Sequence, residues 1–198
     1  GVHVNYSLNV DSSDRCLDFL TNADTTIPLI VAGTVNPKFV EAWKGEVYWF
    51  VPDIGLCGQH QFSVADTLSM ISGKTIISSG GNVGTTSVLA AHIVGAKPIG
   101  LLGMDMAHDV DEPLENTPYW NTVFEAYGER ARALFARRTN PYWKNEYVTD
   151  HVFDAYRALF LERVRLLGLD IVNASGQGAL HGGDIRQMRF EEFLSKYG

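Results

Sequence analysis

Cysteines and long apolar runs are both scarce in this sequence. Cys16 and Cys57 are the only cysteines among 198 residues, and they lie far apart, in no spacing typical of a metal site. No apolar run approaches the length that crosses a bilayer, and no signal peptide is visible. These absences argue against a disulfide framework and a membrane span, and they predict a cytoplasmic protein with reduced thiols.

Positive charge is also scarce. The chain has 16 Lys and Arg against 23 Asp and Glu, which gives a net charge of −7. A general affinity for nucleic acid or an anionic membrane is therefore not expected. A G-K-[ST] sequence occurs at Gly73-Lys74-Thr75, but Leu68 stands where the full G-x-x-x-x-G-K-[ST] pattern needs a glycine, so a P-loop is not predicted. The length and the hydrophobic fraction of 45% suit a single α/β domain over residues 1–198.

Apolar segments typical of strands alternate with segments of helical spacing. The strands are expected at residues 2–10, 27–32, 46–51, 75–77, 99–104 and 170–174. Helices are expected at residues 13–20, 37–43, 63–71, 85–94, 119–138, 150–167 and 184–197. This alternation predicts a Rossmann-like α/β fold, with a mainly parallel sheet of about six strands and helices on both faces.

A glycine turn between a strand and a helix is the strongest candidate for a binding site. Its glycines permit positive φ and a close approach of the backbone to a ligand. The amides that open the following helix favour an anion, and three hydroxyls lie in the first turn. The predicted nucleotide- or anion-binding residues here are Gly80, Gly81, Asn82, Gly84, Thr85, Thr86 and Ser87. The alternative is a tight connection with no ligand.

Polar residues follow the strands at 99–104 and 170–174. Asp105 is expected at the carboxyl end of its strand, where open α/β sheets bind ligands, and it would hold a ribose hydroxyl, a metal or an amine. Asn173, Ser175 and His181 are expected to reach the same crevice. Asp105, His108 and Asp109 form a weak candidate for a divalent-cation site, and the alternative is a solvated acidic loop.

Residues 109–150 are predicted to form a helical lid insertion. Its helix at 119–138 ends in a basic cluster, and aromatic and cationic side chains follow it. The expected lid residues are Arg137, Tyr142 and Trp143. In the earlier glycine-rich loop at 52–61, His60 is a further candidate catalyst, although a loop histidine is more often only a surface residue.

Three stretches of the sequence resemble one protein family. The most specific is GGNVGTTSVLAAHIVGAKPIGLLGMDMAH, and IPLIVAGTVNPKFVEAWKGEVYWF and NASGQGALHGGDIRQMRFEEFL also match. They are similar to the 6-hydroxymethylpterin diphosphokinase MptE-like family, which includes the motility accessory factor proteins implicated in attaching nonulosonic acids to flagellin. The resemblance implies a Rossmann-like fold that binds a nucleotide or a nucleotide-sugar.

The sequence departs from the family pattern at two places. The pterin diphosphokinases carry acidic residues in the glycine block that suit Mg-ATP, whereas this chain has Val83, Gly84, Thr85 and Thr86. This difference favours the transferase branch. Family members also have an earlier strand and a G-x-G-P-S-like turn, so the chain is expected to be a fragment or a short member.

Three functions follow as hypotheses. The first is a glycosyltransferase-like transferase with a nucleotide-activated sugar donor, in which Asp105, His108, His60 and His181 are the candidate catalytic residues. The second is a 6-hydroxymethylpterin diphosphokinase that uses ATP, with Mg²⁺ held by Asp105 and Asp109. The third is a non-catalytic Rossmann-like binding domain. The expected partner is a nucleotide or nucleotide-sugar, and self-association into a homo-oligomer is left open.

Overall fold

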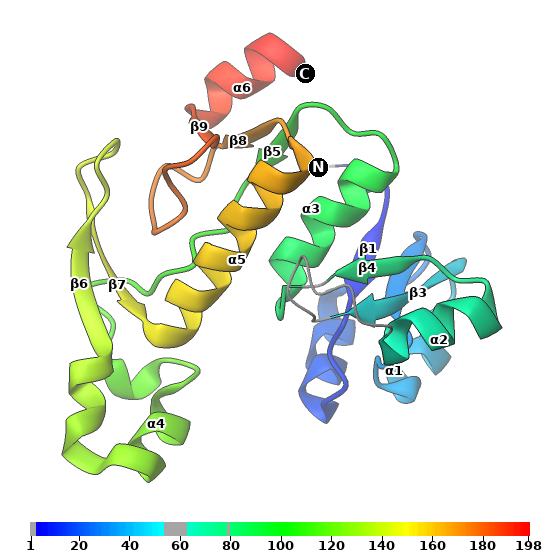
Figure 1. The fold of residues 1–198 in the computed structure, drawn as a ribbon, viewed down its shortest axis with the longest axis horizontal. Coiled ribbons are helices and arrows are strands. Elements are labelled where there is room, and N and C mark those ends of the chain that lie inside the picture. Colours follow the sequence, from blue (N-terminus) through cyan, green and yellow to red (C-terminus); the bar gives the residue numbers. More distant parts are fainter. Residues whose placement is uncertain (1–2, 54–62, 79) are drawn as a thin grey trace. The chain divides into compact units, whose positions relative to one another are not determined.

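The computed structural model describes residues 3–53, 63–78 and 80–198. The chain divides into two compact units, Gly1–Ile93 and Val94–Gly198, which we call the first and the second unit. Figure 1 shows their helices and strands. Each unit is described by itself below.

The first unit is built on a parallel sheet of four strands in the order β1-β2-β3-β4. The strands are β1 (Ser7–Asn9), β2 (Leu29–Ala32), β3 (Val47–Asp53) and β4 (Ile76–Ser78), and Ile30 pairs with both Leu8 and Tyr48. The connections contain a 3₁₀ helix, η1 (Asp14–Asn22), and the helices α1 (Pro37–Glu41) and α2 (Val64–Ser72). After β4, α3 (Val83–Ile93) returns to contact β1, at the opposite edge of the sheet.

The core of the first unit lies between β2 and the segments around it. Leu29 and Val31 are fully buried, in the same cluster as Cys16, Phe39 and Trp43. The rings of Phe39 and Trp43 stack with their centroids 5.7 Å apart, and the Trp43 indole donates to the carbonyl of Ile27 at 2.8 Å. The indole therefore satisfies its polar atom while it fills the core.

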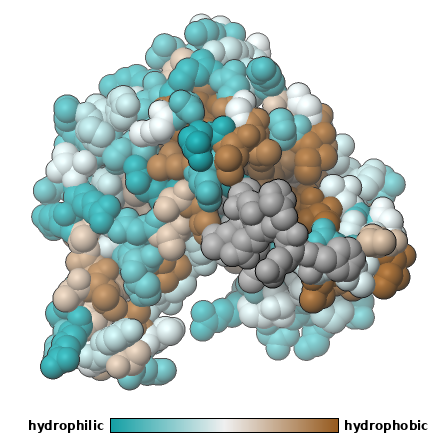
Figure 2. Space-filling model, in the orientation of Figure 1, coloured by the Kyte–Doolittle hydropathy of each residue, from teal (hydrophilic) through white to brown (hydrophobic). Residues whose placement is uncertain are grey.

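Helix starts were predicted well where a side chain caps them. Ser63 and Asp66 form the reciprocal capping box of α2, and Asn36 caps α1 with Pro37 in its first turn. α2 also exposes Val64, Leu68, Met70 and Ile71, and Figure 2 shows hydrophobic surface over this helix. None of the helices in the described ranges is long and apolar enough to span a bilayer.

The second unit contains a parallel sheet of three strands in the order β5-β8-β9. These strands are β5 (Ile99–Leu101), β8 (Ile171–Asn173) and β9 (Arg186–Gln187). An antiparallel hairpin joins β6 (Phe135–Thr139) to β7 (Glu146–Asp150), and α5 (His151–Leu167) leads from β7 toward β8 (Figure 1). The remaining elements are η2 (Leu114–Asn116), α4 (Trp120–Tyr127), η3 (Gly128–Leu134) and α6 (Phe190–Tyr197).

The predicted α/β, Rossmann-like fold with mainly parallel strands is confirmed. The described residues hold seven parallel strands in two sheets, rather than about six in one. α5 is capped by Asp150 at its start and by Gly168 at its end, as its sequence predicts, and it buries Phe160 and Val164. The last helix begins at Phe190 rather than near residue 184, because β9 occupies part of that segment.

The prediction of one helix over residues 119–138 is wrong. α4 ends at Gly128, which has φ of 55°, and the chain then forms η3 and the strand β6. The helix-forming residues of the second half are overridden by pairing with β7, in which Arg137 opposes Val148. The segment predicted as a lid loop is accordingly the end of a β-hairpin.

Candidate functional site

The turn that opens α3 is the candidate anion site of the first unit. Gly80 and Gly81 have φ of 58° and 81°, as the sequence predicts for this turn. The Asn82 side chain accepts a hydrogen bond from the Thr85 amide at 2.9 Å and donates to the Thr85 hydroxyl at 3.0 Å. Asn82 is therefore the cap of α3 and not a ligand-facing side chain.

The three hydroxyls of the first turn are bonded to the helix itself. Thr85 and Thr86 are fully buried, and the Thr86 hydroxyl donates to the carbonyl of Asn82 at 3.0 Å. The Ser87 hydroxyl donates to the carbonyl of Val83 at 2.9 Å. Thr86 and Ser87 thus donate their hydroxyl hydrogens to carbonyls of the preceding turn, and the Thr85 hydroxyl is engaged by Asn82, so none of these contacts is made to a ligand.

The amides of Val83 and Gly84 are what remains of the predicted anion site. Asn82 accepts from the amides of Thr85 and Thr86, through its side chain and its carbonyl respectively. Within the described residues, the first two amides of α3 have no acceptor, as is usual for the start of a helix. They lie just beyond the carboxyl end of β4, where a parallel sheet presents its ligand-binding edge.

The second unit contains a buried pair of histidine and aspartate. His108 is 8% exposed, and its Nε2 lies 2.9 Å from Oδ2 of Asp150, which is 1% exposed. Asp150 also accepts from the amides of Val152 and Phe153, at 2.8 and 2.9 Å, and so caps α5. Burial raises the pKa of Asp150, but these three hydrogen bonds outweigh it and hold the pKa below its ordinary value. His108 is therefore joined through its Nε2 to the residue that caps α5.

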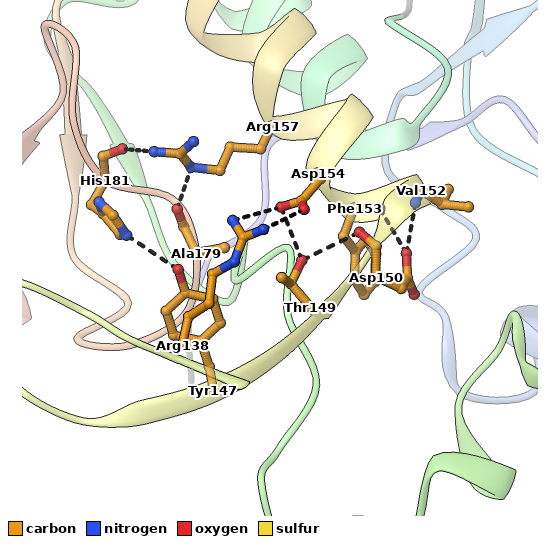
Figure 3. Close-up of polar contacts among 10 residues, drawn as sticks. All are labelled: Arg138, Tyr147, Thr149, Asp150, Val152, Phe153, Asp154, Arg157, Ala179 and His181. Carbon is orange, nitrogen blue, oxygen red and sulfur yellow. Dashed lines mark hydrogen bonds and ion pairs between the residues drawn. The ribbon is translucent and has the colours of Figure 1, made fainter. Parts of the chain in front are cut away.

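His181 lies in a different environment. Its Nε2 is 3.3 Å from the Tyr147 hydroxyl, and Arg157 donates to the carbonyls of Ala179 and His181, both at 2.6 Å (Figure 3). Burial, followed by repulsion from Arg157 and Arg138, lowers the pKa of His181 below its ordinary value. The lowered pKa favours the neutral form of the imidazole. The ring lies beside the Tyr147 phenol, and the backbone carbonyl of His181 accepts from Arg157.

Asn173 and Ser175 organise the loop that carries His181. The fully buried Asn173 side chain accepts from the Ser175 amide at 3.0 Å and donates to the carbonyl of Leu180 at 2.8 Å. The Ser175 hydroxyl accepts from the amide of Met104 at 3.3 Å. Both side chains predicted to bind a nucleotide are thus engaged with backbone groups.

The three expected lid residues are spread over the β6–β7 hairpin. Arg137 pairs with Glu146 at 3.2 Å, and the Trp143 indole donates to Gln187 at 3.2 Å. Tyr142 is 55% exposed, with its ring 6.4 Å from the His181 ring. Of the three, Tyr142 alone lies against a candidate catalytic residue.

The expected metal site is not formed. Within residues 3–53, 63–78 and 80–198, the structure contains no group of three His, Cys, Asp or Glu side chains arranged to hold a metal ion. His108 is committed to Asp150, and Asp109 accepts the amide of Asp111 at 2.9 Å. Asp105 instead faces Gln177, whose side chain donates to its Oδ2 at 3.2 Å. His60 lies outside the described residues.

The family is decided by the sequence match. The model of the 6-hydroxymethylpterin diphosphokinase MptE-like family matches residues 1–111, more than half of the chain. The chain belongs to this family. Residues 1–111 include the α3 turn together with Asp105, His108 and Asp109, whereas the hairpin and His181 lie outside the match.

The fold of this MptE-like chain also resembles a solved structure. The MAf glycosyltransferase from Magnetospirillum magneticum AMB-1 matches with a TM-score of 0.62 and 13% sequence identity. The match covers 95% of this chain but 27% of that protein, so the chain spans about a quarter of its length. No curated protein gives a sequence match.

The structure gives roles to two residues of this MptE-like chain that are not among the residues predicted from its sequence. Asn140 is fully buried, accepts from the amides of Tyr142 and Trp143, and donates to the carbonyl of Gly178 at 2.9 Å. The Asn-Pro pair at 140–141 is a known turn signal and could have predicted this role. Arg157 had no such signal, because its position on α5 looks like an ordinary solvated helix face.

Proposed function

We propose that this chain is the donor-binding part of a transferase that uses a nucleotide-activated sugar. Membership of the MptE-like family and the likeness of the fold to a glycosyltransferase support a transferase. The observation that carries the proposal is the pair of amides at Val83 and Gly84, which have no acceptor among the described residues and follow two glycines with positive φ. Such a pair suits the phosphate of a nucleotide.

The residue proposed as general base is His181. A base for an acceptor hydroxyl works best when its imidazole is neutral near the working pH, and burial and two arginines favour the neutral form. In the transfer, the acceptor oxygen forms a bond to the sugar carbon, the bond from that carbon to the phosphate oxygen breaks, and the acceptor proton goes to a general base. The nucleotide leaves with the electron pair of the broken bond.

A proline substitution tests the amide site without removing a side chain that the fold needs. Proline is accepted at the first position of a helix, so Val83→Pro deletes one amide donor while α3 is kept. We expect the affinity for CMP- or UDP-linked sugars to fall roughly ten- to hundred-fold, as for the loss of a hydrogen bond to a charged group. Calorimetric titration of the wild-type chain and the variant measures this effect.

The matched control is Val83→Ala, which shortens the same side chain but keeps the amide. It should bind the nucleotide as the wild type does. Equal affinity in Val83→Pro and Val83→Ala would show that the phosphate lies elsewhere. If neither CMP-linked nor UDP-linked sugars bind the wild-type chain, the proposal fails.

The name of the family supports a second function, pyrophosphoryl transfer from ATP to a hydroxymethyl pterin. It needs Mg²⁺, which usually takes one or two carboxylates together with the phosphates, and Asp105 and Asp109 are the carboxylates considered. Formation of AMP from Mg-ATP and the pterin, abolished in Asp105→Asn, would favour this function over sugar transfer. A chain that binds nucleotides but turns over neither substrate would be a binding domain.

A further inference from the structure

A polar cavity in the second unit lies beside Asp105. It has a volume of about 180 Å³, and its lining includes Asp105, Asp109, Asn145, Glu146, Tyr147 and Gln177. The residues come from the loop after β5, the start of β7 and the loop after β8. At roughly 30 Å³ for each water of the liquid, the cavity has room for about six waters, or for one small ligand.

Most polar groups of this lining already have partners. Gln177 donates to Oδ2 of Asp105, the Tyr147 hydroxyl meets His181, and Glu146 pairs with Arg137. A carboxylate oxygen of Asp109 accepts the amide of Asp111. These contacts fix the walls of the cavity without using all of its hydrogen-bonding capacity.

Two oxygens of the lining are buried without a partner. They are Oδ1 of Asp105 and Oδ1 of Asn145, and the described residues supply no donor to either. Leaving a buried acceptor unpaired destabilises the fold, and the penalty is larger for a charged group. Both atoms therefore lack a donor among the described residues, and a bound ligand would supply one.

The loop after β8 fixes the position of Asp105. Ala179 donates its amide to the Asp105 carbonyl at 2.8 Å, and a Cβ on Gly178 would lie 2.5 Å from that same oxygen. Gly178 also has φ of 82°, so both the lack of space for a side chain and the backbone conformation favour glycine at this position. The loop can seat against Asp105 only because Gly178 has no side chain.

The charge of the lining selects among possible donors. Among the described residues, the lining has three carboxylates and the imidazole of His108, whose Nε2 meets Asp150, but neither lysine nor arginine. Arg137 offsets the charge of Glu146 alone. An anionic group would be repelled, and a neutral hydroxyl would supply hydrogen bonds but no charge. An ammonium group supplies both.

We propose that this cavity binds the amino group of a small polyhydroxyl ligand, through Oδ1 of Asp105 and Oδ1 of Asn145. That the ligand is the acceptor of the transferase rests on the proposed function. The binding itself does not, because it needs no nucleotide.

Three sugars of nearly equal size test the proposal: glucosamine, glucose and gluconate. Titration of the wild-type chain, followed through the side-chain amide resonances of Asn145 and Gln177, should show saturable binding of glucosamine, weaker binding of glucose and none of gluconate. Asp105→Asn and Asn145→Ala should each weaken glucosamine binding roughly ten- to hundred-fold. Asp105→Asn should also raise the melting temperature of the ligand-free chain, which a structural role for the carboxylate would lower.

The matched control is Asp109→Asn. It removes the same charge from the same lining, but neither of its oxygens is among the buried atoms without a partner, so affinity should change less than threefold. An equal loss in Asp109→Asn and Asp105→Asn, preferential binding of gluconate, or no saturable binding would overturn the proposal. Val83→Pro should leave glucosamine binding unchanged, so a failure of the nucleotide site is distinguishable from a failure of this cavity.

Discussion

Asp150 joins three polar contacts at the start of α5. It caps α5 through the amides of Val152 and Phe153 and accepts from the buried imidazole of His108. In Asp150→Ala, the cap is lost and His108 is left without its acceptor. We expect the free energy of unfolding in urea to fall by roughly 2–4 kcal/mol.

The control for this prediction is Asp150→Asn, which keeps an oxygen for the two amides and should cost less than Asp150→Ala. The pH dependence has a definite sign. Because the folded pKa of Asp150 lies below its unfolded value, its contribution is present above the unfolded pKa and is lost as the pH falls through the folded pKa. Equal stabilities of Asp150→Ala and the wild type would contradict the assignment.

His181 should make the stability of the folded chain depend on pH over a different range. Its pKa is lowered in the folded chain, so the unfolded chain binds more protons as the pH falls through about 6.5. Stability should therefore decline between about pH 6.5 and the lower folded pKa. His181→Gln keeps a polar partner for Tyr147 and should remove this decline. Urea unfolding of both proteins at several pH values measures it, and parallel curves would speak against the assigned shift.

At the scale of elements, the β6–β7 hairpin depends on one side chain at its tip. Asn140 holds the amides of Tyr142 and Trp143 and reaches the carbonyl of Gly178. Asn140→Ala should lower the free energy of unfolding by about 2 kcal/mol, because buried groups lose their partners. It should also increase amide exchange in residues 140–145, which mass spectrometry detects.

The control is Asn116→Ala, at an exposed asparagine in η2, which should change neither stability nor exchange. Should Asn140→Ala leave exchange at the hairpin tip unaltered, the tip would be held by other contacts, such as that of Trp143 with Gln187.

What the sequence could predict depends on how far apart the deciding residues lie. The caps at Ser63 and Asp150 and the stop at Gly168 are set by residues within one turn, and all three are confirmed. The strand β6 was missed because its helix-forming residues are overridden by pairing with β7, which begins at Glu146, more than one helical turn beyond the end of β6 at Thr139. The pairing of His108 with Asp150 spans 42 residues and had no local signal.

Candidate site residues were named from the sequence, but their orientations were not. The α3 turn was located by its glycines, yet spacing does not reveal that Thr86 and Ser87 bond back to the helix. Asp105 was identified at the end of its strand. Gln177, 72 residues away, donates to its Oδ2, while Oδ1 has no donor among the described residues, and only the folded chain shows this difference.

At the scale of the whole molecule, negative charge dominates, with 23 acidic residues against 16 basic ones. Three arginines of the basic cluster near residue 130 already pair with carboxylates of the chain. Arg132 pairs with Glu115, Arg137 with Glu146 and Arg138 with Asp154. A nucleotide phosphate should therefore be attracted at short range by amides and not at long range by arginines.

This predicts an unusual salt dependence for nucleotide binding. Raising the ionic strength from about 0.01 to 0.15 M shortens the screening length from about 30 to 8 Å, which weakens the repulsion between the acidic chain and the nucleotide. The association rate measured by stopped flow should therefore rise, while dissociation, governed by short-range hydrogen bonds, should change little. Cytidine, which has no phosphate, serves as the uncharged control and should show no salt effect. A steep loss of affinity with salt would instead mean that lysines or arginines neutralise the phosphate, which would assign the site to the basic cluster rather than to the start of α3.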